Sequence, residues 1–101
     1  MPKAYVLVEL AVTDPKGFEP YKPLSEVALA AYSGRYLARG GACELLEGAG
    51  TPSRVTVLEF PDLDTAKAWY DSPEYREARA ARADAATGRF IVVEGVAEDA
   101  G

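Results

Sequence analysis

The order of secondary-structure signals along this 101-residue chain predicts an α+β domain with the ferredoxin-like βαββαβ fold. Four segments rich in β-branched and apolar residues alternate with two regions of helical spacing, in the order β, α, β, β, α, β. The strand segments also carry apolar residues on both faces, which is typical of a sheet covered on both sides. Such units usually form a four-stranded antiparallel sheet with both helices on one face. We therefore expect one domain over residues 1–97 and a loose tail over residues 98–101.

The first strand and the first helical region are expected within residues 4–31. Residues 4–12 alternate between two largely apolar faces, so they read as a strand. Asp14-Pro15 suits a helix start, because Asp caps the first turn and Pro fits the first helical position. Proline lacks a backbone N–H, so we expect a break near Pro23 and a second helical piece over residues 25–31.

The middle of the chain is expected to be extended. Residues 35–47 read as one long extended segment with Gly40-Gly41 in its middle, where paired glycines indicate a bulge or a bend. Cys43 would then be a small buried hydrophobic residue in this strand. A turn over residues 48–53 and a strand over residues 54–60 follow.

The second helical region is expected to have two starts. Asp62 would cap the first, and Ser72 would cap the second with Pro73 in the first helical position. The Ala- and Arg-rich segment 75–86 favours helix, Gly88 would stop it, and the final strand would run over residues 89–96. The arginines at positions 76 and 79 are expected to be solvated partners of nearby glutamates.

Composition excludes several classes of function. The net charge of −5 argues against nucleic acid and anionic membranes as partners. One cysteine forms no internal disulfide, and the sequence contains neither a signal-peptide pattern nor an apolar run of membrane-spanning length. Histidine is absent, which removes the commonest metal ligand and the commonest general base near neutral pH. We expect a cytoplasmic protein with no metal site and no cofactor.

The doubly apolar strands predict self-association. Tyr5 and Leu7 alternate with Val6 and Val8 in the first strand, and Phe90 and Val92 alternate with Ile91 and Val93 in the last strand, so both faces are apolar. If the helices cover one face of the sheet, the other would expose a large apolar surface. A second copy of the chain would cover it as a twofold dimer. The alternative is that the C-terminal tail or residues 35–47 fold over this face.

Several segments together resemble the domain-of-unknown-function family numbered 1330, over nearly the whole chain from Tyr5 to Val96. The matching segments are residues 31–41, 58–61, 68–75 and 93–95. The resemblance implies the dimeric α/β-barrel superfamily, in which two ferredoxin-like subunits pack sheet to sheet and leave pockets beside each sheet. Relatives include cofactor-independent monooxygenases, muconolactone isomerases, haem-degrading enzymes and stress-response proteins. The family has no settled activity, so fold alone assigns none.

Candidate ligand-binding residues lie in two places. Arg39 precedes Gly40 and Gly41, where a guanidinium and close backbone N–H groups could bind an oxyanion; a salt bridge at the surface or the dimer interface explains Arg39 equally well. Tyr75 and Arg82 lie two helical turns apart and could form a polar pocket lining with Tyr32.

The junction of the second helical region supplies further candidates. Trp69 and Tyr70 are adjacent and point to different sides of the helix, so one would pack in the core and the other could line a cleft; a core position is favoured for Trp69. Ser72 is interpreted mainly as a helix cap, because the chain has no histidine to activate it. We include both Trp69 and Ser72 among the candidate ligand-binding residues.

Glu59 is the candidate catalytic residue. Glu59 and Glu9 each occur in an otherwise apolar strand, where a carboxylate could serve as a general acid or base. An arginine such as Arg35, Arg39 or Arg82 could instead neutralise it, and this structural interpretation is favoured.

Three functions remain open. The first is a dimer that binds a small acidic or aromatic metabolite in a pocket between sheet and helices. The alternative is a cofactor-independent isomerase or monooxygenase that uses a carboxylate base and arginine charge stabilisation. The third is an interaction module with a filled interior.

Overall fold

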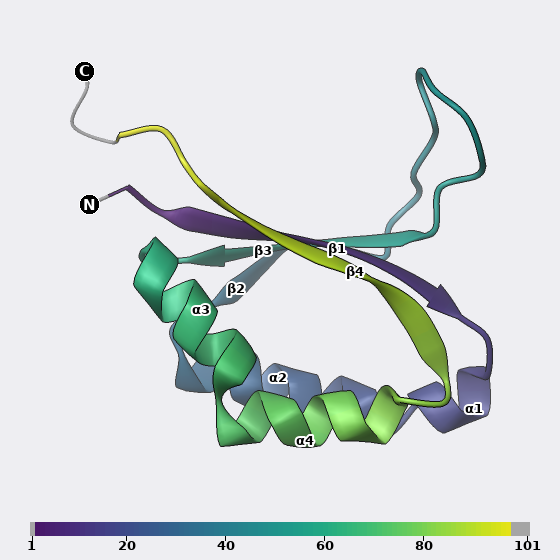
Figure 1. The fold of residues 1–101 in the computed structure, drawn as a ribbon, viewed down its shortest axis with the longest axis horizontal. Helices are drawn as coiled ribbons and strands as arrows, with labels where there is room; N and C mark the ends of the chain where they lie inside the picture. Colours follow the sequence, from purple (N-terminus) through teal and green to yellow (C-terminus); the bar gives the residue numbers. More distant parts are fainter. Residues whose placement is uncertain (1, 98–101) are drawn as a thin grey trace.

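The computed structural model describes residues 2–97, and it confirms the ferredoxin-like α+β architecture. The predicted tail over residues 98–101 lies outside the described residues. The elements follow in the order β1 (Ala4–Val12), α1 (Pro15–Phe18), α2 (Tyr21–Ala31), β2 (Arg35–Arg39), β3 (Arg54–Phe60), α3 (Leu63–Asp71), α4 (Pro73–Arg82) and β4 (Ala86–Glu94). The strands form one antiparallel sheet in the order β2-β3-β1-β4, and the helices lie together on one of its faces (Figure 1).

Alternation along the strands creates two different faces, as predicted. In β1, Val6, Val8 and Leu10 are buried against the helices, whereas Leu7 points to the other side and is 38% exposed. The edge strand β4 follows the same alternation, because paired residues point to the same face. Val8 lies opposite Phe90, and Leu7 lies opposite Ile91. We call the side away from the helices the open face. Its residues include Tyr5, Leu7, Glu9, Val57, Glu59, Ile91 and Val93.

Aromatic side chains fill the space between the sheet and the helices. Trp69, Tyr75 and Phe60 are the largest fully buried side chains in the described range. The ring centres of Trp69 and Tyr75 are 4.3 Å apart, and those of Phe60 and Trp69 are 5.1 Å apart. These contacts join β3, α3 and α4 into one core, so the position of Trp69 in the core is confirmed. None of the helices within residues 2–97 is long and apolar enough to cross a membrane.

The expected helix break near Pro23 is wrong. The break occurs at Glu19-Pro20, and Pro23 lies in the first turn of α2. The N–H groups of a first turn have no partner within the helix, so a proline there removes nothing that the helix uses.

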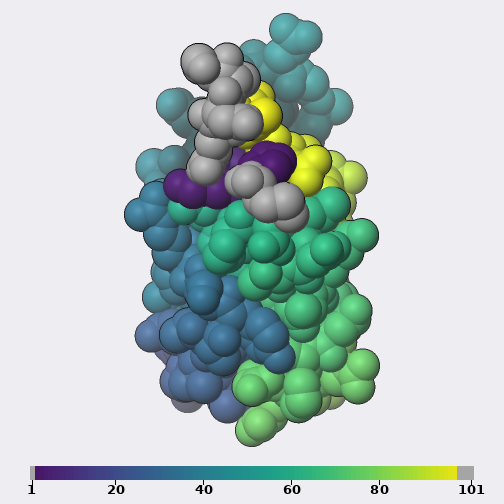
Figure 2. Space-filling view, turned by 90° about the vertical axis from the view of Figure 1, so that its left-hand side faces the viewer, coloured from purple at the N-terminus to yellow at the C-terminus, as the bar shows by residue number. Residues whose placement is uncertain are grey.

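The long extended segment over residues 35–47 is also wrong, because β2 ends at Arg39. Gly40 adopts a φ of +62°, a left-handed conformation that turns the chain out of the sheet. Residues 40–53 then form a loop that projects away from the helical layer (Figures 1 and 2). Cys43 lies in this loop and is exposed, contrary to the prediction. The loop leaves Leu7, Ile91 and Val93 of the open face exposed, so it does not cover that face.

The end of the second helical region differs from the prediction as well. The helix α4 ends at Arg82, and β4 begins at Ala86, so Gly88 is a strand residue and does not stop the helix. It lies opposite Leu10 of β1. A Cβ atom at this position would overlap the carbonyl oxygen of Glu9, so the close approach of the two backbones requires glycine there.

Candidate functional site

A cavity of about 620 Å³ lies between the sheet and the helix pair α3–α4. Its floor is the covered face of the sheet, where Val6, Phe90 and Val92 contribute apolar side chains and Gly88 contributes none. Val92 is 39% exposed although it is on the covered face, because the cavity lies in front of it. The volume is within the range of pockets that hold small organic ligands.

Three side chains from the helices line the cavity and carry N–H groups that lack a partner in the described residues. The indole Nε1 of Trp69 and the Nε atoms of Arg79 and Arg82 are buried and have no hydrogen-bond partner within residues 2–97. All three side chains line this cavity. A buried donor without a partner costs about 1–3 kcal/mol, so three donors around one cavity are an unusual concentration. The side chains that carry these donors thus border one cavity, where a bound molecule could accept hydrogen bonds from them.

Aromatic rings hold the two arginines. The guanidinium of Arg79 lies over the ring of Tyr70, 4.3 Å from its centre, and that of Arg82 lies 5.1 Å from the centre of Phe90. The two arginines are three positions apart on α4, so they project from the same side of the helix. Neither forms an ion pair with a carboxylate in the described part of the chain.

Lys67 and Asp71 also line the cavity, from α3. Its charged lining therefore contains three cations and one carboxylate. This excess is opposite in sign to the net charge of the chain, −5. The cavity favours an anion over a cation.

Tyr75 and Ser72 lie next to the cavity but have structural partners. The hydroxyl groups of Tyr75 and Tyr21 are 2.7 Å apart in the core. Burial raises the pKa of Tyr75 above its ordinary value, and the neighbouring Arg82 opposes this with a smaller effect. The hydroxyl of Ser72 accepts a hydrogen bond from the backbone N–H of Tyr75 and donates one to the carbonyl of Trp69, so the predicted helix cap is confirmed.

The other predicted ligand-binding residues lie elsewhere. Arg39 donates a 2.8 Å hydrogen bond to Glu26, which raises the pKa of Arg39. It borders a second cavity of about 20 Å³, room for little more than a water molecule. Gly40 and Gly41 follow on the exposed loop, and Tyr32 packs against the core at the end of α2. The structure brings Trp69 and Arg82 together and leaves Tyr32, Arg39, Gly40 and Gly41 outside their cavity.

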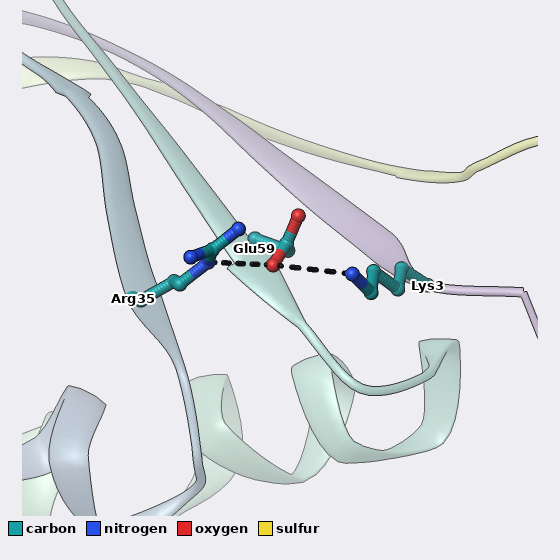
Figure 3. Close-up of polar contacts among 3 residues, drawn as sticks. All are labelled: Lys3, Arg35 and Glu59. Carbon is teal, nitrogen blue, oxygen red and sulfur yellow. Dashed lines mark hydrogen bonds and ion pairs between the residues drawn. The ribbon is translucent and has the colours of Figure 1, made fainter.

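Glu59 lies on the open face, across the sheet from the cavity. It accepts a 2.7 Å hydrogen bond from Arg35, and the amino group of Lys3 is 3.8 Å away (Figure 3). Its side chain is 12% exposed. At the other end of the open face, Glu9 accepts a 3.2 Å hydrogen bond from Arg89. The arginine neutralisation considered for Glu59 is therefore present, with Arg35 as the partner.

Sequence reasoning missed Arg79 and Phe90 as cavity residues. Arg79 was expected to be solvated beside a glutamate, but it is half-buried over Tyr70. The usable signal was its spacing of three from Arg82, which places the two on one side of α4. Within residues 2–97, no group of three or more His, Cys, Asp and Glu side chains could hold a metal ion.

Comparison with solved structures finds the same fold at low sequence identity. A protein of unknown function from Rhodopseudomonas palustris aligns at 17% identity with a TM-score of 0.77, covering 95% of this chain and 84% of that one. SnoaB, a cofactor-independent oxygenase from Streptomyces nogalater, aligns at 15% identity with a TM-score of 0.66, covering 100% of both chains. A dimeric ferredoxin-like protein of unknown function from Thermobifida fusca aligns at 17% identity with a TM-score of 0.60, covering 95% and 92%.

Sequence comparison identifies the family. The model of the domain of unknown function DUF1330 matches residues 3–96. The curated proteins contain no match to this chain. The chain belongs to the DUF1330 family, as the sequence resemblance predicted.

Proposed function

We propose that this member of the DUF1330 family binds a small acidic or aromatic molecule in the cavity between the sheet and α3–α4. The observation that carries the proposal is that three residues of one ligand-sized cavity, Trp69, Arg79 and Arg82, each carry a buried N–H group without a partner in the described residues. A ligand with oxygen acceptors would satisfy them and recover the free energy lost by their burial. The apolar floor of Val6, Phe90 and Val92 would hold the rest of the molecule.

Catalysis is the alternative function. SnoaB, which shares the fold at 15% identity, is a cofactor-independent oxygenase. A carboxylate base would be needed, and Glu59 is the predicted one. Its position across the sheet from the cavity, with a direct bond from Arg35, supports binding over proton transfer in this cavity.

The binding proposal is tested by blocking the cavity. Trp69 is the only tryptophan of the chain and lines the cavity, so its fluorescence reports on occupancy. A panel of benzoate, 1-naphthoate, phenol, indole and citrate would be titrated at pH 7. We expect at least one compound to bind saturably below millimolar concentration. Replacing Ala83, an exposed residue at the cavity, in the variant Ala83→Phe should weaken that binding at least tenfold.

The matched control is Ala80→Phe. Ala80 is exposed on α4, three positions before Ala83, and does not line the cavity, so this variant adds an identical ring elsewhere. Its affinity should equal that of the wild type. If no compound of the panel saturates, or if Ala83→Phe binds as tightly as Ala80→Phe, the cavity is not the binding site.

We also propose that two chains pair through the open face. Leu7, Ile91 and Val93 are 38%, 40% and 47% exposed and lie together on adjacent strands. Covering such a surface favours association. Several solved relatives of this fold are described as dimeric, among them the Thermobifida fusca protein. The pairing would leave the cavity accessible, because the cavity is on the opposite side of the sheet.

A further inference from the structure

We infer that the ligand is an ionised aromatic carboxylic acid of one or two rings. The carboxylate would bind the N–H edges of Arg79 and Arg82, and the rings would lie on Phe90 and Val92. The indole N–H of Trp69 would donate to a ligand oxygen. This inference rests on the proposed binding function and adds to it the charge and the shape of the ligand.

The negative charge follows from a comparison of Arg79 and Arg82 with the five other arginines of the chain. Three of these, Arg35, Arg39 and Arg89, each form an ion pair with a glutamate at 2.7–3.2 Å, and Arg76, which has no ion pair in the described residues, is exposed to water. Arg54 also has no ion pair there, but it lies over the ring of Phe18 and does not line this cavity. Arg79 and Arg82 are more enclosed, since each has a buried Nε, yet the described residues offer them no carboxylate. A buried charge without a partner is costly, and two like charges on one side of a helix add repulsion. A carboxylate supplied by the ligand would relieve both costs.

The shape follows from how the guanidinium groups are held. The guanidinium carbon of Arg79 lies 4.3 Å from the centre of the Tyr70 ring, and that of Arg82 lies 5.1 Å from the centre of the Phe90 ring. A guanidinium held over a ring can still offer N–H groups at its edge, and two such groups match the two oxygens of a carboxylate. The rings restrict both side chains before any ligand arrives, which lowers the entropy lost on binding.

The aromatic body of the ligand follows from the remaining lining. Phe90 offers a ring, and the ring centres of Tyr70 and Phe90 are 5.8 Å apart, so a flat ligand would extend an existing aromatic cluster. Val6 and Val92 continue this apolar floor. A cavity of about 620 Å³ holds one or two rings together with a carboxylate.

The test compares 1-naphthoate with 1-naphthamide, a neutral molecule of nearly the same shape. Both would be titrated into the wild-type protein at pH 7 by calorimetry and by Trp69 fluorescence. We expect the acid to bind about 10- to 100-fold more tightly than the amide, the range expected for charge-assisted hydrogen bonds to one carboxylate. Equal affinities would overturn the inference and leave the binding function standing. If neither molecule binds while phenol, indole or citrate does, the inference fails and the binding function stands; if no compound of the panel binds, both fail.

Variants on α4 locate the contact. Arg79→Gln and Arg82→Gln should each weaken 1-naphthoate at least tenfold and change 1-naphthamide less than threefold. The control Arg76→Gln removes an exposed arginine of the same helix that does not line the cavity, and it should change neither affinity. Circular dichroism would show that each variant is folded. An equal loss of acid and amide affinity would indicate altered packing and would contradict a carboxylate contact.

Discussion

On the open face of the sheet, Glu59 is paired with Arg35 and Lys3, and Glu9 is paired with Arg89. On the covered face, the charges at the cavity are not matched: Arg79 and Arg82 have no carboxylate partner within residues 2–97. The same sheet separates the two sets of charges, so the contrast is between its two sides.

The difference separates two uses of charge. Charges that are paired in advance can be buried against another protein surface at low cost, because their attraction offsets part of the desolvation penalty. Charges that are left unpaired are available to a small anion. This contrast is consistent with the two proposals made above, pairing of chains through the open face and ligand binding at the cavity.

The largest expected effect comes from placing one carboxylate on either face. Val8 is 3% exposed on the covered face, and Val8→Asp would bury an unpaired charge at a cost of several kcal/mol. Domain stability is typically about 5–15 kcal/mol, so we expect this variant to be largely unfolded by circular dichroism at 25 °C. The neighbouring Leu7→Asp should remain folded and lose self-association.

Analytical ultracentrifugation checks the second half of this prediction. The wild type should sediment as a dimer of the 10.8 kDa chain, and Leu7→Asp as a monomer. If Leu7→Asp unfolds as readily as Val8→Asp, Leu7 is as important as Val8 for the folding of the single chain, which contradicts the prediction. If it stays dimeric, the open face is not the interface.

The next largest effect concerns the hydrogen bond between the buried hydroxyl groups of Tyr75 and Tyr21, on the covered side of the sheet. Tyr75→Phe would leave the buried hydroxyl of Tyr21 without its partner at 2.7 Å, and we expect a loss of about 1–3 kcal/mol in the free energy of unfolding. Urea unfolding followed by Trp69 fluorescence measures it. Tyr21→Phe is the reciprocal variant and should lose a similar amount.

The pH dependence of the same residue follows from its raised pKa. The folded state keeps Tyr75 neutral, whereas the unfolded chain releases the proton near pH 10. The unfolded state then binds fewer protons, so stability is fully present below pH 10 and falls as the pH rises above it, by up to about 1.4 kcal/mol per pH unit. Tyr75→Phe should show a shallower alkaline decline. Identical slopes would mean that Tyr75 is accessible to water.

The smallest expected effect is the difference in stability between removing a paired charge and removing an unpaired one. Glu59→Gln would leave Arg35 and Lys3 without their shared carboxylate, and we expect it to cost about 1 kcal/mol of stability. Arg79→Gln should change the stability of the ligand-free protein by less than about 0.5 kcal/mol, because lost stacking on Tyr70 is offset by relief of an unpaired charge. Thermal unfolding measures both. Equal losses would remove the distinction between the two faces.

Local chemistry made much of the fold predictable from the sequence. The alternation of β1 requires only a period of two, so the opposite directions of Leu7 and Val8 could be predicted. The cap at Ser72 depends on residues within one turn of it. Both features are set by neighbours in sequence, and both were predicted correctly.

The cavity depends on contacts between distant segments and was less predictable. Arg79 lies in a helix rich in alanine and arginine, where small side chains and long amphipathic ones leave the buried side undefined. Its environment is decided by Tyr70 on α3 and by β4, which no local pattern of α4 contains. The end of β2 was missed for a related reason, because a glycine pair is compatible with a bulge or an exit, and only the positive φ of Gly40 decides between them.

The strand order also sets when the molecule can be completed during synthesis. β1 is a central strand whose neighbours are β3 and β4, and β4 begins more than 70 residues after β1 ends. At roughly 5–20 residues per second, a ribosome needs several seconds to make that intervening chain. Throughout this interval one edge of β1 has unpaired backbone groups, which can template association with another strand. The first strand made is therefore the one that waits longest for its partner, and nascent chains would need protection at that edge.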